Sequence, residues 1–137
     1  MIEMIRHRKS VVAATALAAA ATSLVLAAPD AAADVNSVTV TGTSLSLGVD
    51  RFGTGCSYTV DVTGSPYEDV YLFDSNSAGF GQQQLRLDNS GNASTSWSPS
   101  ATGTHVITAW ARRGGPQFAW EQVGSGMDLG SACVVTS

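Results

Sequence analysis

The fold is decided by the stretch Cys56-Ser57-Tyr58-Thr59-Val60-Asp61-Val62. In a β-strand, successive side chains point to opposite faces of the sheet. One face of this stretch therefore carries Cys56, Tyr58, Val60 and Val62, and the other face carries only polar side chains. This strict alternation of apolar and polar residues predicts a β-strand with one face in a core and the other in water.

Short runs of the same kind continue to the C-terminus, separated by Gly, Asn, Ser and Asp, and no helical stripe interrupts them. We expect strands at residues 38–49 (with a break near Gly42), 56–62, 70–74, 85–88, 93–97, 104–112, 118–123 and 129–135. Short strands at close spacing with turn residues between them are typical of a sandwich. We therefore predict an all-β, immunoglobulin-like antiparallel β-sandwich of about seven strands.

The first 33 residues have the pattern of a secretory signal peptide. Arg6, Arg8 and Lys9 precede an uncharged, alanine-rich run over residues 11–28, and Ala31-Ala32-Ala33 supplies the small residues that a cleavage site needs. We expect cleavage before Asp34, so that residues 1–33 are removed and residues 34–137 form the exported domain, preceded by the signal peptide in the precursor.

The alternative is an uncleaved membrane anchor, because the apolar run is about long enough to span a bilayer as a helix. Alanine is only weakly apolar, however, and no basic stop-transfer residues follow the run. The pattern therefore favours a secreted, extracellular protein, with the cell envelope as a further location.

The exported part is acidic. Residues 34–137 contain four arginines, no lysine and nine aspartates and glutamates. A surface with this balance repels phosphate backbones and anionic lipid headgroups. The composition therefore disfavours nucleic acid as a partner and, after signal cleavage, the membrane surface.

Both cysteines, Cys56 and Cys133, lie in the exported part. In an oxidising compartment two cysteines most economically form one disulfide. Closing the long loop between Cys56 and Cys133 would stabilise the fold by about 4 kcal/mol in the chain-entropy model. Two free thiols or an intermolecular bridge are the alternatives.

Three segments resemble the bacterial immunoglobulin-like domains of secreted and surface proteins. Residues 53–60 resemble that family's second strand, residues 70–74 its third, and residues 91–97 running into 103–109 its E–F pair. The resemblance implies a β-sandwich used for adhesion, spacing or recognition. A weaker likeness is to the small secreted actinobacterial chromophore-binding apoproteins, which carry two disulfides where this chain has cysteines for one.

Two features depart from the family pattern. Antibody domains bridge strands B and F, whereas Cys133 lies on the last predicted strand, so a bridge to Cys56 would pin the C-terminus to strand B. The stretch 112–126 is also longer and more aromatic than a plain connection between strands requires.

Catalytic and metal-binding patterns are weak. His105 is the only histidine after residue 33, and alternation places it inward, where we expect a partly buried histidine with one hydrogen bond. The chain has no Gly-x-Ser-x-Gly motif, and one histidine without a free thiol disfavours a zinc site. Residues 74–79 and 88–92 offer oxygen ligands for calcium, but neither matches the spacing of a calcium loop, and Asp and Asn also form turns. We predict no enzyme, no cofactor and no metal.

The aromatic residues are the most informative feature for function. Alternation places Trp97 in the core. The same alternation turns several rings outward on strands that are neighbours in such sandwiches, and two arginines follow one of these strands. Exposed aromatic side chains with arginine are typical of recognition surfaces. The candidate binding residues are Tyr71, Phe73, Trp110, Arg112, Arg113, Phe118 and Trp120.

Two other arrangements would remove this surface. Trp110 and Trp120 can pair with each other across a long hairpin, or the segment 112–126 can fold back and cover them.

Together these patterns favour a secreted, non-catalytic binding or adhesion module that recognises an extracellular protein or a cell-envelope glycan. One alternative is a structural, envelope-associated domain with no specific ligand. Another is a carrier that holds a small apolar molecule in a cleft between strands.

Overall fold

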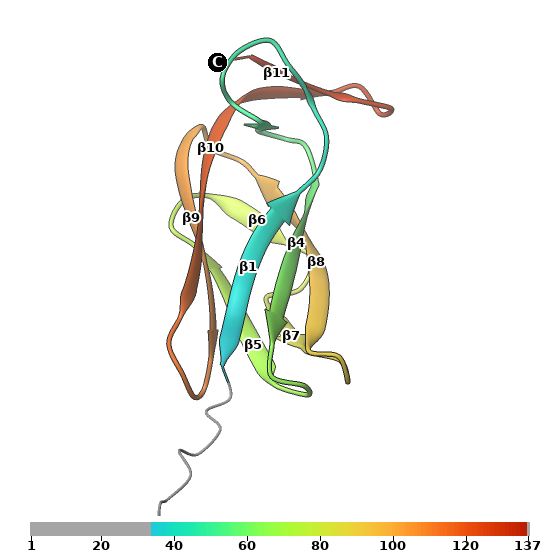
Figure 1. The fold of residues 1–137 in the computed structure, drawn as a ribbon. Helices are drawn as coiled ribbons and strands as arrows, with labels where there is room; N and C mark the ends of the chain where they lie inside the picture. Colours follow the sequence, from blue (N-terminus) through green and yellow to red (C-terminus); the bar gives the residue numbers. More distant parts are fainter. Residues whose placement is uncertain (1–33, 137) are drawn as a thin grey trace, which may run out of the picture.

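The computed structural model describes residues 34–136, and the regular elements in this range are all β-strands (Figure 1). They are β1 (Val35–Thr41), β2 (Leu45–Ser46), β3 (Phe52–Gly53), β4 (Tyr58–Gly64), β5 (Asp69–Asp74), β6 (Ala78–Phe80), β7 (Gln84–Arg86), β8 (Asn92–Pro99), β9 (Gly103–Ala111), β10 (Gln117–Asp128) and β11 (Cys133–Thr136). The strands form an immunoglobulin-like sandwich of two sheets. One sheet has the order β1-β4-β8-β6, the other has the order β2-β11-β10-β9-β5-β7, and β3 pairs with β10.

The predicted alternation holds in both sheets. In β4, the side chains of Tyr58, Val60 and Val62 are buried against the second sheet. In β9, Ile107 and Ala109 are buried from the opposite side. Burying a side chain of this size contributes about 1.5–3 kcal/mol, so the two facing stripes supply much of the stability of the sandwich.

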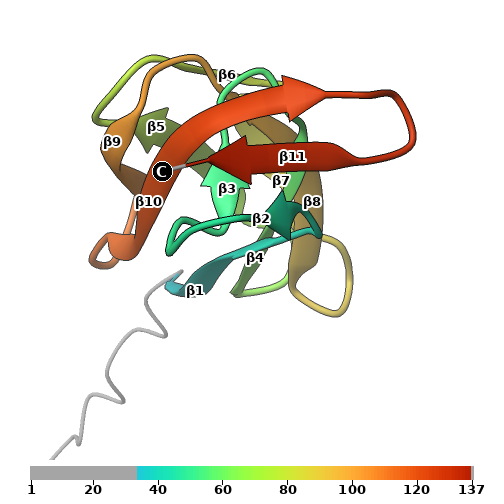
Figure 2. The same ribbon diagram turned by 90° about the horizontal axis from the view of Figure 1, so that it is seen from above.

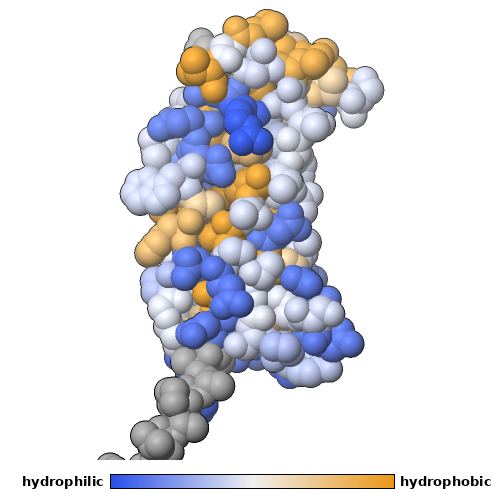
Figure 3. Space-filling view, viewed as in Figure 1, coloured by the Kyte–Doolittle hydropathy of each residue, from blue (hydrophilic) through white to orange (hydrophobic). Residues whose placement is uncertain are grey.

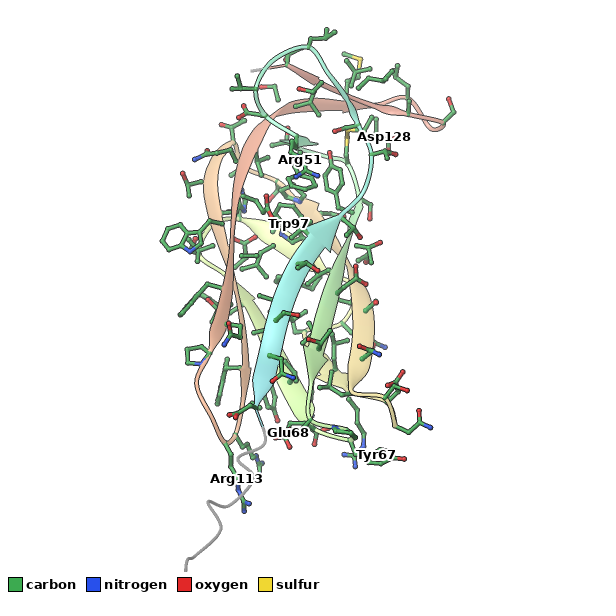
Figure 4. The ribbon with its side chains drawn as sticks, in the orientation of Figure 1. Arg51, Tyr67, Glu68, Trp97, Arg113 and Asp128 are labelled. Carbon is green, nitrogen blue, oxygen red and sulfur yellow. A yellow bond between two sulfur atoms is a disulfide. The ribbon has the colours of Figure 1, made fainter. Side chains whose placement is uncertain are left out.

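Trp97 lies at the centre of the core, as predicted, and Figure 4 shows it between the two sheets. Its ring meets those of Phe52 and Tyr58 at centroid distances of 5.8 and 5.9 Å, and Phe52 meets Tyr58 edge to face at 4.7 Å. Edge-to-face pairs add stability beyond the area that they bury. The ring cluster therefore fixes β3, β4 and β8 against one another.

The predicted break near Gly42 moves the chain from one sheet to the other. Residues 35–41 pair with β4 in the first sheet, while β2 pairs with β11 in the second. Gly42 has a φ of +149°, and a Cβ at this position would lie 2.7 Å from Cδ1 of Tyr58. Only glycine allows the chain to turn this closely over the tyrosine ring.

The structure differs from the expected antiparallel sandwich of about seven strands in two details. The pairings of β2 with β11 and of β3 with β10 are parallel, so the sandwich is not purely antiparallel. In addition, the described residues form eleven strands where about seven were expected. The short strands β2 and β7 overlap the predicted segments 38–49 and 85–88, whereas β3 and β6 were not predicted. Pieces of two or three residues are too short to show a periodic pattern in the sequence.

The strand β10 is much longer than the predicted 118–123, and it bends away from the sandwich at its C-terminal end (Figures 1 and 2). Its first part pairs with β9 and its last part with β11. At the bend, a Cβ on Gly126 would collide with the carbonyl oxygen of Thr54, so glycine lets the loop before β4 lie against the strand. The predicted strand 129–135 begins only at Cys133, because Leu129 donates a backbone hydrogen bond to Ala132 in the turn.

The predicted disulfide between Cys56 and Cys133 is present, with a Cα–Cα distance of 6.0 Å and a sequence separation of 77 residues. Both cysteines are buried. The bridge joins Cys56, in the loop just before β4, to β11 in the second sheet, so it ties the C-terminal strand to the core as expected.

The signal-peptide prediction for residues 1–33 lies outside the described residues. Between residues 34 and 136 there is no helix with the length and apolar character needed to cross a membrane.

Candidate binding face

Five aromatic side chains share the outward surface of β5, β9 and β10, which we call the aromatic face. In order along the chain they are Tyr71, Phe73, Trp110, Phe118 and Trp120. Phe73, Trp110, Phe118 and Trp120 expose 60%, 46%, 52% and 70% of their surface, and Tyr71 is partly buried. A contiguous exposed patch of apolar side chains often marks an interaction site.

The strand register brings the rings together in rows across the sheet. Tyr71 lies opposite Trp110, and their ring centroids are 5.4 Å apart with planes tilted by 32°. Thr108 lies opposite both Phe73 on one side and Phe118 on the other. Successive outward residues of a strand are about 7 Å apart, so the rings stand in rows on the outer surface of one sheet.

The two arrangements that would have hidden this surface are not found. Trp120 lies opposite Val106, so it does not pair with Trp110 across the hairpin. The segment 112–126 leads directly into β10 and continues the sheet instead of folding back over it.

The predicted arginines lie at one end of the aromatic face. Arg112 and Arg113 are exposed in the turn between β9 and β10, and Figure 4 shows Arg113 at the end of the molecule opposite Asp128. They border the row of Trp110 and do not lie among the other rings.

Polar side chains lie between the rings, and the sequence analysis did not identify them. Gln84 of β7 is exposed opposite Tyr71, and Thr108 lies between Phe73 and Phe118. At the far end, Nε2 of Gln122 donates to Oγ1 of Thr104 at 2.7 Å. Finding these neighbours requires the register of β7, β5, β9 and β10, which alternation within single strands does not give.

Charged groups are confined to one end of this surface. Arg86 donates to Asp69 at 3.3 Å beside the row of Tyr71, as an exposed pair that contributes little stability. Between the row of Tyr71 and Thr104, the outward-facing residues of β5, β9 and β10 in the described structure include no acidic or basic side chain.

Behind the aromatic face, β5 and β9 are joined by a buried polar network. The carboxylate of Asp74 accepts from Nε1 of Trp97 at 2.7 Å and lies 2.8 Å from Nδ1 of His105. It also accepts the backbone N–H of Asn76 at 2.9 Å. Nε2 of His105 donates to the carbonyl oxygen of Ala101 at 2.7 Å.

This network corrects the expectation of a partly buried histidine with one hydrogen bond. His105 is 0% exposed and both of its ring nitrogens have partners. A carbonyl oxygen can only accept, so the pair requires one proton on Nε2 and another between Nδ1 and the carboxylate. The histidine has no free nitrogen to exchange a proton with a substrate.

The two runs considered for calcium are turns. Oδ1 of Asp74 accepts from the N–H of Asn76, and Oδ1 of Asp88 accepts from those of Ser90 and Asn92 at 2.8 and 2.9 Å. These are the side-chain-to-backbone bonds through which aspartate forms turns. Within the part of the chain that the structure describes, no group of three or more His, Cys, Asp or Glu side chains is placed to hold a metal ion.

A second exposed apolar surface, the aliphatic tip, lies at the bend of β10 and is visible at the top of Figure 3. Its members come from the loop around β2 and from the hairpin of β10 and β11, and are Leu45, Leu47, Val49, Met127 and Leu129. Shallow hollows of about 200–250 Å³ lie here, lined by residues that include Thr43, Ser131 and Val134.

Glu121 is the one side chain in the described residues whose pKa is clearly displaced. Partial burial raises its pKa above the usual range, and the nearby Arg51 guanidinium opposes this by lowering it. Arg51 also lies 5.5 Å from the centroid of the Phe52 ring.

Comparison with known proteins supports the fold and goes no further. No family profile matches the chain, and no curated protein matches it. Among solved structures, it is similar to the C-terminal 282-residue fragment of intimin, solved in complex with the intimin-binding domain of the translocated intimin receptor. The TM-score is 0.54 at 10% sequence identity, and the match covers 68% of this chain and 34% of the fragment. The chain thus spans about a third of that fragment's length.

Proposed function

We propose that this protein is a secreted, non-catalytic binding or adhesion module that recognises an extracellular partner through the aromatic face. The observation that carries the proposal is the gathering of four exposed rings and Tyr71 on one sheet surface. Rings at the centre of an interface contribute more to binding than most other side chains.

The rigidity of the surface supports this role. The rings project from paired strands, and the Asp74–His105 pair joins β5 to β9 directly behind them. Because little conformational freedom remains to be lost on association, such a surface binds at a lower entropic cost than a loop does. The likeness to an intimin fragment that was solved with its receptor is consistent with a binding role at this general level.

The other functions have less support. The Asp74–His105 pair is buried, and its outer nitrogen is bonded to a backbone carbonyl, which is consistent with a structural role. The hollows of about 200–250 Å³ at the aliphatic tip are smaller than the roughly 300 Å³ or more of typical ligand pockets, which disfavours a carrier. A purely structural domain would leave the exposed rings without a use.

The proposal is tested by binding of the purified protein to cell envelopes of the bacterium that encodes it. Trp120→Ala and Phe118→Ala should weaken binding by about tenfold or more, as expected for residues at the centre of an interface. Their melting temperatures should change little, because both rings are exposed. Leu47→Ala is the matched control, since it removes an exposed apolar side chain at the aliphatic tip.

Equal loss of binding in the control, or no dependence on the rings, would contradict the proposal. If the domain has only a structural role, binding should not depend on the rings. Secretion is tested separately, by intact mass: the exported protein should begin at Asp34 and lack two hydrogens because of the disulfide.

A further inference from the structure

We infer that the partner of the aromatic face is a neutral glycan, recognised by packing of sugar rings on the aromatic side chains. This inference rests on the proposed function and adds the chemical class of the ligand. Three observations on the described surface carry it, namely the separation of rings from aliphatic side chains, the absence of charge between the row of Tyr71 and Thr104, and the polar groups between the rings.

The molecule separates its exposed rings from its exposed aliphatic side chains. The exposed aliphatic residues Leu45, Leu47, Val49, Met127 and Leu129 all lie at the aliphatic tip. The exposed rings lie on the aromatic face, apart from Tyr67 in the loop between β4 and β5. A partner that required only apolar area would be served by either type of side chain. The predominance of rings among the exposed apolar side chains of this face points to a ligand that is recognised by the flat surface of an aromatic ring.

Four classes of ligand use the flat surface of a ring, namely nucleobases, organic cations, proline-rich peptides and sugars. Proline-rich peptides dock in grooves lined by rings, and the protease treatment described below tests for them. Stacked nucleic acid requires a positively charged groove along its backbone. The exported part instead has nine acidic residues against four arginines. Organic cations bind in cages of rings around the charge. Here the rings lie side by side on one sheet surface, so neither nucleic acid nor an organic cation fits these features.

A sugar fits the remaining features. One side of a pyranose ring presents C–H groups, which pack on aromatic carbon, and its edge presents hydroxyls, which need uncharged donors and acceptors. Gln84 offers such groups beside Tyr71, Thr108 between Phe73 and Phe118, and Gln122 at the end near Trp120. Because this stretch carries no acidic or basic side chain, a neutral glycan is favoured over a charged one.

The dimensions fit a chain of sugars rather than a single unit. The rows of Tyr71 and Trp120 are separated by two steps of two residues, which is about 14 Å along the strands. A single pyranose ring is shorter than this stretch, so the rows can contact several sugars of an extended polysaccharide.

The test uses cell envelopes of the encoding bacterium treated in two ways: one portion is digested with protease, and another is oxidised with periodate, which cleaves sugars that have adjacent hydroxyls. Binding of the purified protein should survive protease and fall by about tenfold or more after periodate. Binding should also change little as salt is raised, because screening affects only charged contacts.

Two variants test the role of the ring itself. Trp120→Leu keeps an apolar side chain but removes the flat ring, and should weaken binding by about tenfold or more, within the range for hot-spot residues. Trp120→Phe keeps a ring and should retain most of the binding. Leu47→Ser at the aliphatic tip is the control and should bind like the unmodified protein.

The outcomes separate this inference from the proposed function. Loss of binding with protease and its retention after periodate would show a protein partner, which overturns the glycan and leaves the binding module standing. Full binding by Trp120→Leu would likewise overturn recognition by ring stacking. If binding of the protein to the envelopes does not depend on the aromatic face, both the inference and the proposed function fail.

Discussion

Removing the carboxylate of Asp74 should destabilise the protein more than removing any other polar side chain of the second sheet. Its side chain is 3% exposed and bonds to Trp97, His105 and the backbone of Asn76. Asp74→Ala leaves the indole N–H and the imidazole N–H without a partner in the core. Each unsatisfied buried group costs about 1–3 kcal/mol, and removing one partner of a buried hydrogen-bonded pair costs about 3–5 kcal/mol in total.

We therefore expect a loss of about 3–5 kcal/mol, out of a stability of about 5–15 kcal/mol for a native domain. For a domain of this size each kcal/mol lowers the melting temperature by about 4–8 °C, so the fall should exceed about 12 °C. The measurement is urea unfolding followed by tryptophan fluorescence, with a thermal melt as a second readout.

A double-mutant cycle with His105→Ala tests the pairing itself. If the two groups act together, the double variant loses less stability than the sum of the single losses, by about 0.5–3 kcal/mol. Asp61→Ala is the matched control, because this carboxylate accepts bonds from Thr41 and Ser94 at 3.0 and 2.6 Å on an exposed surface. It should cost less than about 1.5 kcal/mol. A loss below about 1 kcal/mol for Asp74→Ala, or additive single losses, would refute the reasoning, since the buried bonds would then carry little net energy.

Three further predictions concern stability. Replacing Cys56 and Cys133 together by serine should lower the free energy of unfolding by about 4 kcal/mol, and an unchanged urea curve would show that the bridge is incidental. Burial disfavours the charged form of Glu121 more than Arg51 favours it, so its folded pKa lies above 4.5 and ionisation costs stability once the pH exceeds that value. Glu121→Gln should thus raise the melting temperature near neutral pH, with the gain vanishing as the pH falls through 4.5; a gain that persists at lower pH would contradict this cause. Gly126→Ala should cost about 1–3 kcal/mol by calorimetry, because its Cβ meets the backbone of the neighbouring loop, and a neutral result would mean that this loop moves freely.

Alternation within single strands was enough to predict the main features of the fold. It placed Tyr58, Val60 and Trp97 inside, and the structure buries all three. The disulfide followed from the chain having only two cysteines, Cys56 and Cys133. These features depend on the period of one strand or on a count of residues, which a sequence states directly.

The remaining features depend on contacts between distant segments. The passage of the chain to the second sheet after Gly42 and the extension of β10 past residue 123 are set by pairings with β11 and β3. The second hydrogen bond of His105 goes to a backbone carbonyl, at Ala101, which no side-chain pattern marks. Likewise, Gln84 becomes part of the candidate site only through its register with Tyr71.

In β5 and β9, neighbouring residues of one strand belong to the buried network and to the aromatic face. Phe73 on the aromatic face is followed by Asp74 in the buried network, and Val106 on the face is preceded by His105. Because successive residues of a strand point to opposite sides, the pair that joins the strands inside also fixes the separation of the side chains outside. The positions of the rings are therefore set before any partner binds. The buried polar atoms of the network all have hydrogen-bond partners. In these strands, the residues that form the core alternate with the residues that form the aromatic face, so one sequence pattern predicts both.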